Sequence, residues 1–158
     1  MRKKVFICLI CLLLFGCKNE QSSENQNFDI YNTIREQLIA QKEYDEIYDF
    51  RATVVFNQLE NGYRYDVIID EPVSEMYQIT AMSYADETAD NMCPNIGIFD
   101  EDSYNLKKDY IDKSSGFYKG IQLSGTTLEK QTVRVYVSYY TDANKKQKIE
   151  KYIEVKEE

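Results

Sequence analysis

The sequence predicts a mainly β protein, an antiparallel β-sandwich of immunoglobulin-like type preceded by one N-terminal helix. From Phe50 onward, apolar and polar residues alternate in about seven short runs, spaced roughly ten residues apart and separated by turn-forming residues. Before that point, within residues 28–48, apolar residues recur at intervals of three and four, as they do on one face of a helix. The alternative is an α+β fold in which the helix packs across a single curved antiparallel sheet.

The N-terminus has the composition of an export signal. Residues 2–4 are Arg-Lys-Lys, and residues 5–15 are apolar and uncharged. A basic start followed by such a run is the pattern of a secretory signal peptide. At about 1.5 Å of rise per residue, the run is too short to cross a hydrocarbon core of about 30 Å as a helix.

The end of this run carries the most specific motif in the chain. Leu14-Phe15-Gly16-Cys17 resembles the lipobox of bacterial lipoproteins, in which an aliphatic, a variable and a small residue precede a cysteine. The resemblance covers residues 1–17 only. It implies that residues 1–16 are a signal peptide, that cleavage falls between Gly16 and Cys17, and that the Cys17 thiol carries diacylglycerol. We therefore expect a lipid-anchored protein at the extracytoplasmic face of the cell membrane.

The next segment is predicted to be a tether. Residues 17–27 contain, after the cysteine, no apolar side chain. Nothing in them offsets the entropy lost on ordering, so we expect them to be disordered. A single globular domain is predicted to follow over residues 28–158.

The helix of this domain is expected over residues 28–48. Tyr31, Ile34 and Leu38 recur at the spacing of one helical face. We expect this apolar stripe to pack against the β-rich body.

The β-rich body covers residues 50–156, and its strongest local signal is Asn61-Gly62. This dipeptide separates two alternating runs and predicts a hairpin with a tight turn. Residues 86–116 are less regular. The strands are expected at residues 50–56, 63–69, 76–85, 96–99, 118–123, 132–140 and 149–155.

The composition excludes several functional classes. The chain has 158 residues, which suits one domain, and contains no His. Without His there is no Ser-His-Asp triad, no Cys-His pair and no imidazole ligand for zinc. The 27 acidic and 19 basic residues give a net charge of −8, which argues against a nucleic-acid partner. We expect no enzymatic activity, no cofactor and no metal site.

Cleavage before Cys17 would leave Cys93 as the only other cysteine of the mature chain. No disulfide could then form within the domain. A catalytic cysteine would want a His partner, so we predict that Cys93 is buried as a small hydrophobe. The alternative is a redox or intermolecular role.

The candidate binding residues are Arg134, Tyr136 and Tyr140, which alternate with valines along one predicted strand. If the valines face the core, these three side chains are exposed on the opposite face. Tyrosine combines a broad apolar ring with a hydroxyl group, which suits contacts with proteins. The alternative is that tyrosine is present because it suits strands.

A second candidate is the acidic loop Asp100-Glu101-Asp102. Alternate acids in a loop can supply oxygen ligands to calcium, but the glycine and the final glutamate of an EF-hand loop are missing. We therefore interpret it as a solvated acidic loop within residues 86–102, which contain acids and no base.

Together these features predict a membrane-anchored surface lipoprotein with a non-catalytic binding domain and a protein partner at the cell surface. The alternative is an immunity or inhibitor lipoprotein that neutralises an exported toxin or hydrolase through its acidic surface.

Overall fold

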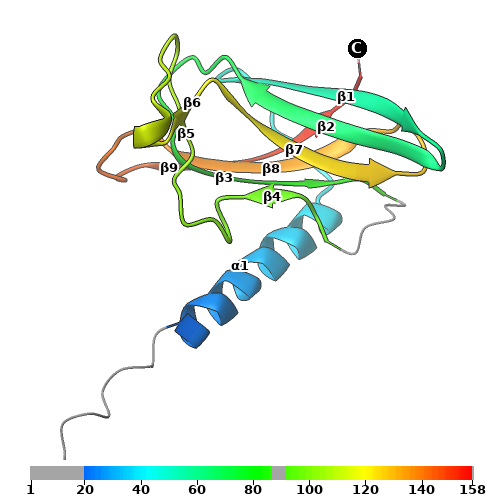
Figure 1. The fold of residues 1–158 in the computed structure, drawn as a ribbon, viewed down its shortest axis with the longest axis horizontal. Helices are drawn as coiled ribbons and strands as arrows, with labels where there is room; N and C mark the ends of the chain where they lie inside the picture. Colours follow the sequence, from blue (N-terminus) through cyan, green and yellow to red (C-terminus); the bar gives the residue numbers. More distant parts are fainter. Residues whose placement is uncertain (1–19, 87–91, 158) are drawn as a thin grey trace, which may run out of the picture.

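The computed structural model describes residues 20–86 and 92–157 (Figure 1). The residues around Gly16 and Cys17 lie outside this part of the chain. In order, the elements are α1 (Glu20–Ala40), β1 (Arg51–Leu59), β2 (Gly62–Asp70), β3 (Tyr77–Tyr84), β4 (Asn95–Ile96), β5 (Asn105–Leu106), the 3₁₀ helix η1 (Lys113–Ser115), β6 (Phe117–Tyr118), β7 (Gly120–Thr127), β8 (Val133–Tyr140) and β9 (Lys148–Val155). The protein is therefore mainly β with one α-helix in the described residues, as predicted.

The strands form two larger antiparallel sheets and one small parallel pair. One sheet has the order β1-β2-β7, the other has the order β4-β3-β8-β9, and β5 pairs with β6. Figure 1 shows three layers, with the β1-β2-β7 sheet on one side, the β4-β3-β8-β9 sheet in the middle and α1 on the other side. The helix packs on an antiparallel sheet, as the α+β alternative expected, but the strands are divided between two sheets.

The hairpin predicted from Asn61-Gly62 is confirmed. Leu59 pairs with Gly62, and the antiparallel register continues to Arg51 opposite Asp70. Gly62 has a φ of +113°, a conformation that residues with a side chain rarely adopt. The turn chemistry of the sequence thus fixes this register.

The two larger sheets share one apolar core. Valine, isoleucine and tyrosine side chains from the inner faces of both sheets belong to a single buried cluster. The Tyr65 hydroxyl also lies 3.2 Å from Ser83 Oγ across the two sheets. Gly125 leaves room for the Tyr65 ring, because a Cβ there would lie 2.5 Å from ring atoms.

The helix begins and ends earlier than predicted. It starts at Glu20, so residues 20–27 of the expected disordered tether are helical, and it stops at Ala40 rather than near residue 48. Residues 41–49 contain four acids, which are unfavourable at the negative end of a helix dipole. None of the described helices is long and apolar enough to span a membrane.

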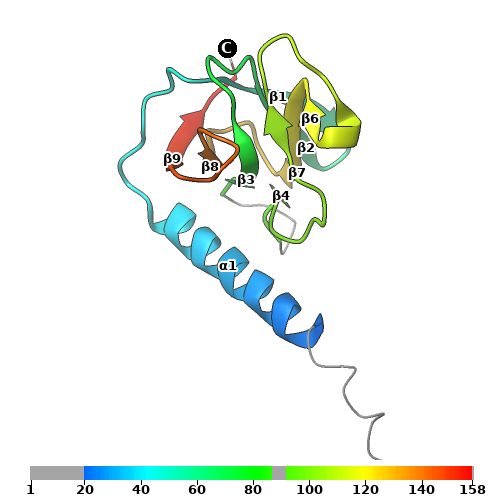
Figure 2. The ribbon, with the colours of Figure 1, turned by 90° about the vertical axis from the view of Figure 1, so that its left-hand side faces the viewer.

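The linker of residues 41–49 runs beside β9, the edge strand (Figure 2). Asp45 N–H donates to Tyr152 O at 2.7 Å, and Tyr152 N–H donates to Asp45 Oδ2 at 2.8 Å. At its end, Asp49 accepts a hydrogen bond from the Tyr139 hydroxyl. Burial and this bond raise the pKa of Tyr139 well above its usual range. The linker thereby covers backbone groups that an open edge would expose.

Candidate binding site

The predicted patch on β8 does not form an exposed surface. Arg134, Tyr136 and Tyr140 do lie on the face opposite the valines, but α1 packs across this face. Tyr136 is only 4% exposed, and its hydroxyl donates to Glu150 Oε1 at 3.1 Å. The expectation that Tyr136 is exposed is therefore wrong, because both faces of β8 are buried by different layers.

The helix is held on this face by the stripe that the sequence indicated. Tyr31, Ile34 and Leu38 are buried against Tyr136 and its neighbours. The Tyr31 hydroxyl accepts a hydrogen bond from Cys93 N–H at 2.6 Å. Cys93 is buried, as predicted, and burial raises the pKa of its thiol. This cluster is a packing interface within the chain.

Arg134 holds the end of the helix. Its Nη1 donates to Ile39 O at 3.2 Å, where the last carbonyls of α1 lack partners within the helix. Its Nη2 donates to Asp86 Oδ2 at 3.2 Å. Tyr140 is partly exposed at the far end of β8. The three predicted residues thus do not act together as one patch.

The acidic loop lies at the surface, and its first residue has a local structural role. Asp100 Oδ2 accepts a hydrogen bond from Gly97 N–H at 2.7 Å, and its Oδ1 accepts one from the Tyr104 hydroxyl at 3.2 Å. Glu101 and Asp102 are exposed. Among the described residues, no group of three acids, Cys or His is arranged to hold a metal ion.

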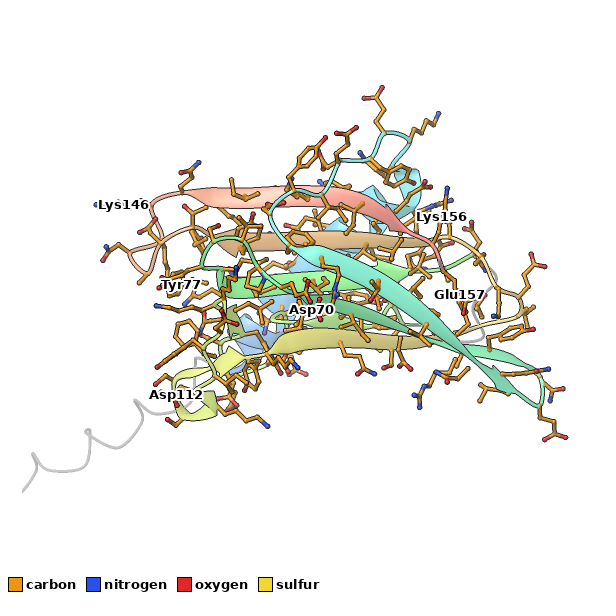
Figure 3. The ribbon with its side chains drawn as sticks, turned by 90° about the horizontal axis from the view of Figure 1, so that it is seen from above. Asp70, Tyr77, Asp112, Lys146, Lys156 and Glu157 are labelled. Atoms are coloured by element: carbon orange, nitrogen blue, oxygen red, sulfur yellow. The ribbon has the colours of Figure 1, made fainter. Side chains whose placement is uncertain are left out.

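A polar network lies on the outer face of the β1-β2-β7 sheet, which Figure 3 shows from above with α1 behind it. At its centre, Asp66 Oδ1 accepts hydrogen bonds from Gln122 Nε2 at 2.9 Å and Ser124 Oγ at 2.6 Å. Its Oδ2 accepts from Asn57 Nδ2 at 3.1 Å and from Arg64, with Nη2 at 2.8 Å and Nε at 3.2 Å. We call these five residues the Asp66 network.

The Asp66 network is built around an ionised carboxylate. Asp66 is 6% exposed, and burial alone would raise its pKa. The hydrogen bonds from Ser124, Arg64 and Gln122 outweigh burial and lower the pKa. Exposed Val55 lies directly across the strand pair from Asp66. The face therefore combines fixed polar groups with accessible apolar surface.

A hollow of about 980 Å³ continues this face at one end of the sheet. Arg51 and Asp70, at the ends of β1 and β2, form one wall. The segment 71–73, the loop 107–111 and Lys119 form the rest. We call this site the loop-end hollow.

A buried side chain fixes the segment that supports the hollow. Asn105 Oδ1 accepts from Gln78 N–H at 2.8 Å, and its Nδ2 donates to Gly116 O at 3.2 Å. These bonds tie the excursion between β4 and β7 to β3. The loop that faces the hollow is thereby attached to the sheet at its base.

The sequence interpretation missed both features. The available signal for the Asp66 network was an acid between the apolar residues Tyr65 and Val67 of one predicted strand. The signal for the hollow was weaker, because its lysines and aliphatic residues come from segments far apart in the sequence. Only the pairing of β1 with β2 and of β2 with β7 brings them together.

Comparison with known proteins gives no relative. No family model, no curated protein and no solved structure matches this chain.

Proposed function

We propose that this protein is a lipid-anchored, non-catalytic binding protein at the extracytoplasmic face of the cell membrane. The anchor is Cys17, within the lipobox-like motif. The binding surface is the outer face of the β1-β2-β7 sheet, and the partner is a protein at the cell surface.

The Asp66 network is the observation that favours this face as the binding surface. Its carboxylate fixes four side chains from three strands in one arrangement. Fixed side chains lose less conformational entropy when a partner binds. Val55 adds apolar area at the centre of the same face. In the described part of the chain, α1 packs on one face of the other larger sheet, and its other face belongs to the shared core.

The strand order supports the finer class, an immunoglobulin-like sandwich. In immunoglobulin nomenclature, β1, β2 and β7 correspond to strands A, B and E, and β4, β3, β8 and β9 to C′, C, F and G. The segment 97–119 takes the place of strand D. Domains of this architecture present both sheet faces and loop ends to partners.

The state of the buried polar groups supports a non-catalytic role. Asp66 is held as an anion whose two oxygens already accept hydrogen bonds, so it has no proton to donate. The Tyr139 hydroxyl is committed to Asp49 inside the core. These groups stabilise the fold and are not positioned to react with a substrate.

The anchor is tested by labelling the full chain with radioactive palmitate in bacterial cells. We expect label on the chain and none on the Cys17→Ser variant, which should also accumulate with its signal peptide attached. Equal labelling of the two chains would contradict the anchor.

The binding surface is tested with a photo-reactive amino acid placed at Val55 in the full chain, in its own cells. We expect one dominant adduct that is lost when Asp66→Ala is added, and no such adduct from the matched exposed position Tyr48. A dominant adduct from Glu101 instead of Val55 would favour the inhibitor alternative over the proposed surface.

A further inference from the structure

We infer that β1 is a pairing edge, to which a second copy of this chain adds its own β1 in antiparallel orientation. The two copies then share one continuous sheet and form a dimer with twofold symmetry. The inference goes beyond the proposed function, because it concerns two copies of the chain and not the partner protein. Only its argument from the membrane rests on the proposed anchor.

The first support is the open side of β1. Leu59 and Gly62 flank the turn of the hairpin and form a hydrogen-bonded pair, and such pairs alternate along an antiparallel ladder with pairs that are not hydrogen-bonded. Every second residue of β1 therefore directs its N–H and C=O groups away from β2. These residues are Ala52, Val54, Phe56 and Gln58.

A side chain occupies this open side at one place. Phe56 N–H donates to Glu157 Oε1 at 3.4 Å, which agrees with its direction away from β2. Across residues 20–86 and 92–157, no backbone group pairs with the outward groups of Ala52, Val54 and Gln58. Glu157 Oε2 accepts from Lys130 Nζ at 2.7 Å. An added strand therefore has to displace only one long hydrogen bond, and Glu157 keeps its ion pair.

β1 also lacks the features that usually protect an edge strand. Edges are commonly blunted by shortness, proline, charged side chains or bulges. β1 has 9 residues, an unbroken register with β2, no proline and no charged residue after Arg51. By contrast, the linker of residues 41–49 covers part of β9, and β4 has only 2 residues. A long unprotected edge suits the addition of a strand.

The outer side chains distinguish β1 from β7, the other edge of the same sheet. The outer face of β7 is polar, and its Gln122 and Ser124 are held by Asp66. On β1, Val55 is 46% exposed and Leu59 is 45% exposed. A strand added at β1 therefore removes apolar surface from water, which favours pairing at this edge.

The side chains of β1 fit a second β1. Val55 is the middle residue of the strand, so a twofold axis there places it opposite the partner's Val55. In this register Arg51 lies opposite the partner's Leu59, and Thr53 lies opposite the partner's Asn57. Like charges facing each other would destabilise the pair, and here none do. The strand is thus complementary to itself.

The same register satisfies the backbone. It places Val54 opposite the partner's Phe56 and Ala52 opposite the partner's Gln58. All four residues direct their N–H and C=O groups toward the other copy, so each facing pair can exchange two hydrogen bonds. A shift by one residue would set outward groups against inward ones, so the pattern of β1 selects this register.

The symmetry of this pairing agrees with two copies anchored in one membrane. The twofold axis that relates antiparallel neighbours is perpendicular to their sheet, so both copies keep α1 on the same side. In Figure 1 the start of α1 points away from the β1-β2-β7 sheet, and only Lys18 and Asn19 separate Cys17 from Glu20. Both proposed anchors therefore lie on one side of the dimer. Confinement to one membrane also raises the effective concentration of the copies.

The pairing is tested by disulfide formation in the Val55→Cys variant of the full chain, in membranes of the cells that make it. The facing Cα atoms of such a pair lie about 4.5 Å apart, within the range of a disulfide. Copper phenanthroline, the oxidant, takes two electrons from the two thiols, which lose their protons. We expect a disulfide-linked dimer that the unaltered chain does not give.

The matched control is Leu59→Cys, which changes an equally exposed residue on the same face of β1. In the inferred register it lies about 26 Å from its counterpart, at about 3.3 Å per residue, so it should give no dimer above the background of the unaltered chain. Equal yields from the two variants would show random collision and overturn the inference. A disulfide from Val55→Cys to a different protein only would overturn the second copy as occupant.

A second measurement uses charge in place of a thiol. Full chains labelled with donor or acceptor dye at Lys146→Cys are reconstituted in phosphatidylcholine vesicles, and energy transfer is followed as lipid is added. We expect Val55→Glu to weaken dimerisation at least about tenfold, because two carboxylates face each other at the axis. Leu59→Glu makes the same change opposite the partner's Arg51 and should stay within about twofold of the unaltered chain. Equal weakening by both, or no transfer between unaltered chains, would overturn the inference.

Failure of this inference is distinguishable from failure of the proposed function, because the mass of the Val55 photo-adduct shows what it contains. An adduct with another protein, together with no disulfide dimer from Val55→Cys, would support the proposed surface and overturn the dimer. A disulfide dimer, together with an adduct that contains two copies of this chain only, would support the dimer and contradict the proposed partner.

Discussion

Asp66 lies among exposed strand residues, yet its own carboxylate is almost completely removed from water. Burying a charge is costly unless hydrogen bonds replace the lost hydration. Here Asn57, Arg64, Gln122 and Ser124 supply that replacement. Because the donors come from β1, β2 and β7, the same carboxylate links all three strands of the sheet.

Replacing this carboxylate should destabilise the fold. We expect Asp66→Asn to lower the free energy of unfolding by about 2 kcal/mol, since its amide NH₂ would face donors that then lack an acceptor. Urea denaturation measures this. The matched control Asp102→Asn changes an exposed residue and should stay within about 0.5 kcal/mol of the unaltered chain. Equal effects of the two changes would contradict the role of the network.

The same residue should make stability depend on acid pH. Its folded pKa is lowered, so its contribution is complete above the unfolded pKa of about 3.9 and is lost as pH falls through the folded pKa. Urea midpoints of the unaltered chain should therefore decline below about pH 4 more steeply than those of Asp66→Asn. Parallel declines would assign the acid sensitivity to other carboxylates.

For a single residue, the sequence predicts whether the side chain is buried better than it predicts which groups the side chain binds. Cys93 was expected to be buried and is buried. Tyr136 was expected to be exposed and is buried. The alternation along a strand shows which side chains share a face, but it does not show whether another element covers that face. Of the four partners of Asp66, only Arg64 lies near it in the sequence, and the other three come from β1 and β7.

Among the elements, α1 is attached to the body by one stripe and a few polar bonds. Leu38 has no exposed surface, whereas Ile39, next to it, is exposed. The Tyr152 hydroxyl adds a hydrogen bond to Gln37 Oε1 at 2.8 Å. The attachment therefore depends on a small set of side chains on one side of the helix.

Truncating the stripe should loosen the helix. We expect Leu38→Ala to cost about 2–4 kcal/mol in urea denaturation and to speed proteolysis within the linker of residues 41–49. Ile39→Ala, its exposed neighbour, should change neither quantity appreciably. Undiminished protease resistance in Leu38→Ala would show that the stripe is not what holds the helix.

The sequence identified the inward face of this helix but not its ends. Tyr31, Ile34 and Leu38 follow from the helical period, and their burial confirms the expected stripe. The acids in residues 41–49 disfavour a longer helix, but the contact that holds its end comes from Arg134, 95 positions away from Ile39, whose carbonyl accepts the hydrogen bond. Such tertiary contacts have no trace in the local pattern. The Asn61-Gly62 turn was predictable because both of its strands are adjacent in sequence.

The two larger sheets share one core, and a second buried cluster joins α1 to the β4-β3-β8-β9 sheet. We therefore expect the two sheets to unfold together. We expect slowly exchanging amides in β2, β7, β3 and β8 to report similar free energies of opening, close to the global value. Native-state hydrogen exchange measures this for each strand. Clearly lower opening energies in one sheet would show that the two layers are separate cooperative units.

The overall class followed from alternation and spacing, whereas the division of strands between sheets did not. β2 pairs with β7 and β3 with β8, and each pairing crosses a long stretch of chain. The pairing of β2 with β7, together with the hairpin of β1 and β2, also brings together the Asp66 network and the sheet end of the loop-end hollow. The proposed site is thus a product of topology, which explains why single-strand patterns indicated a different face.

The position of α1 at the start of the chain has a consequence for the timing of folding. The helix is synthesised first, but the surface it packs on includes Tyr136 and Tyr152, which are synthesised near the end. Leu38 therefore cannot make its native contacts until almost the whole chain has been synthesised. The helix of a nascent chain therefore cannot reach its final position until most of the chain has been made, which suits the export before folding that the proposed location requires.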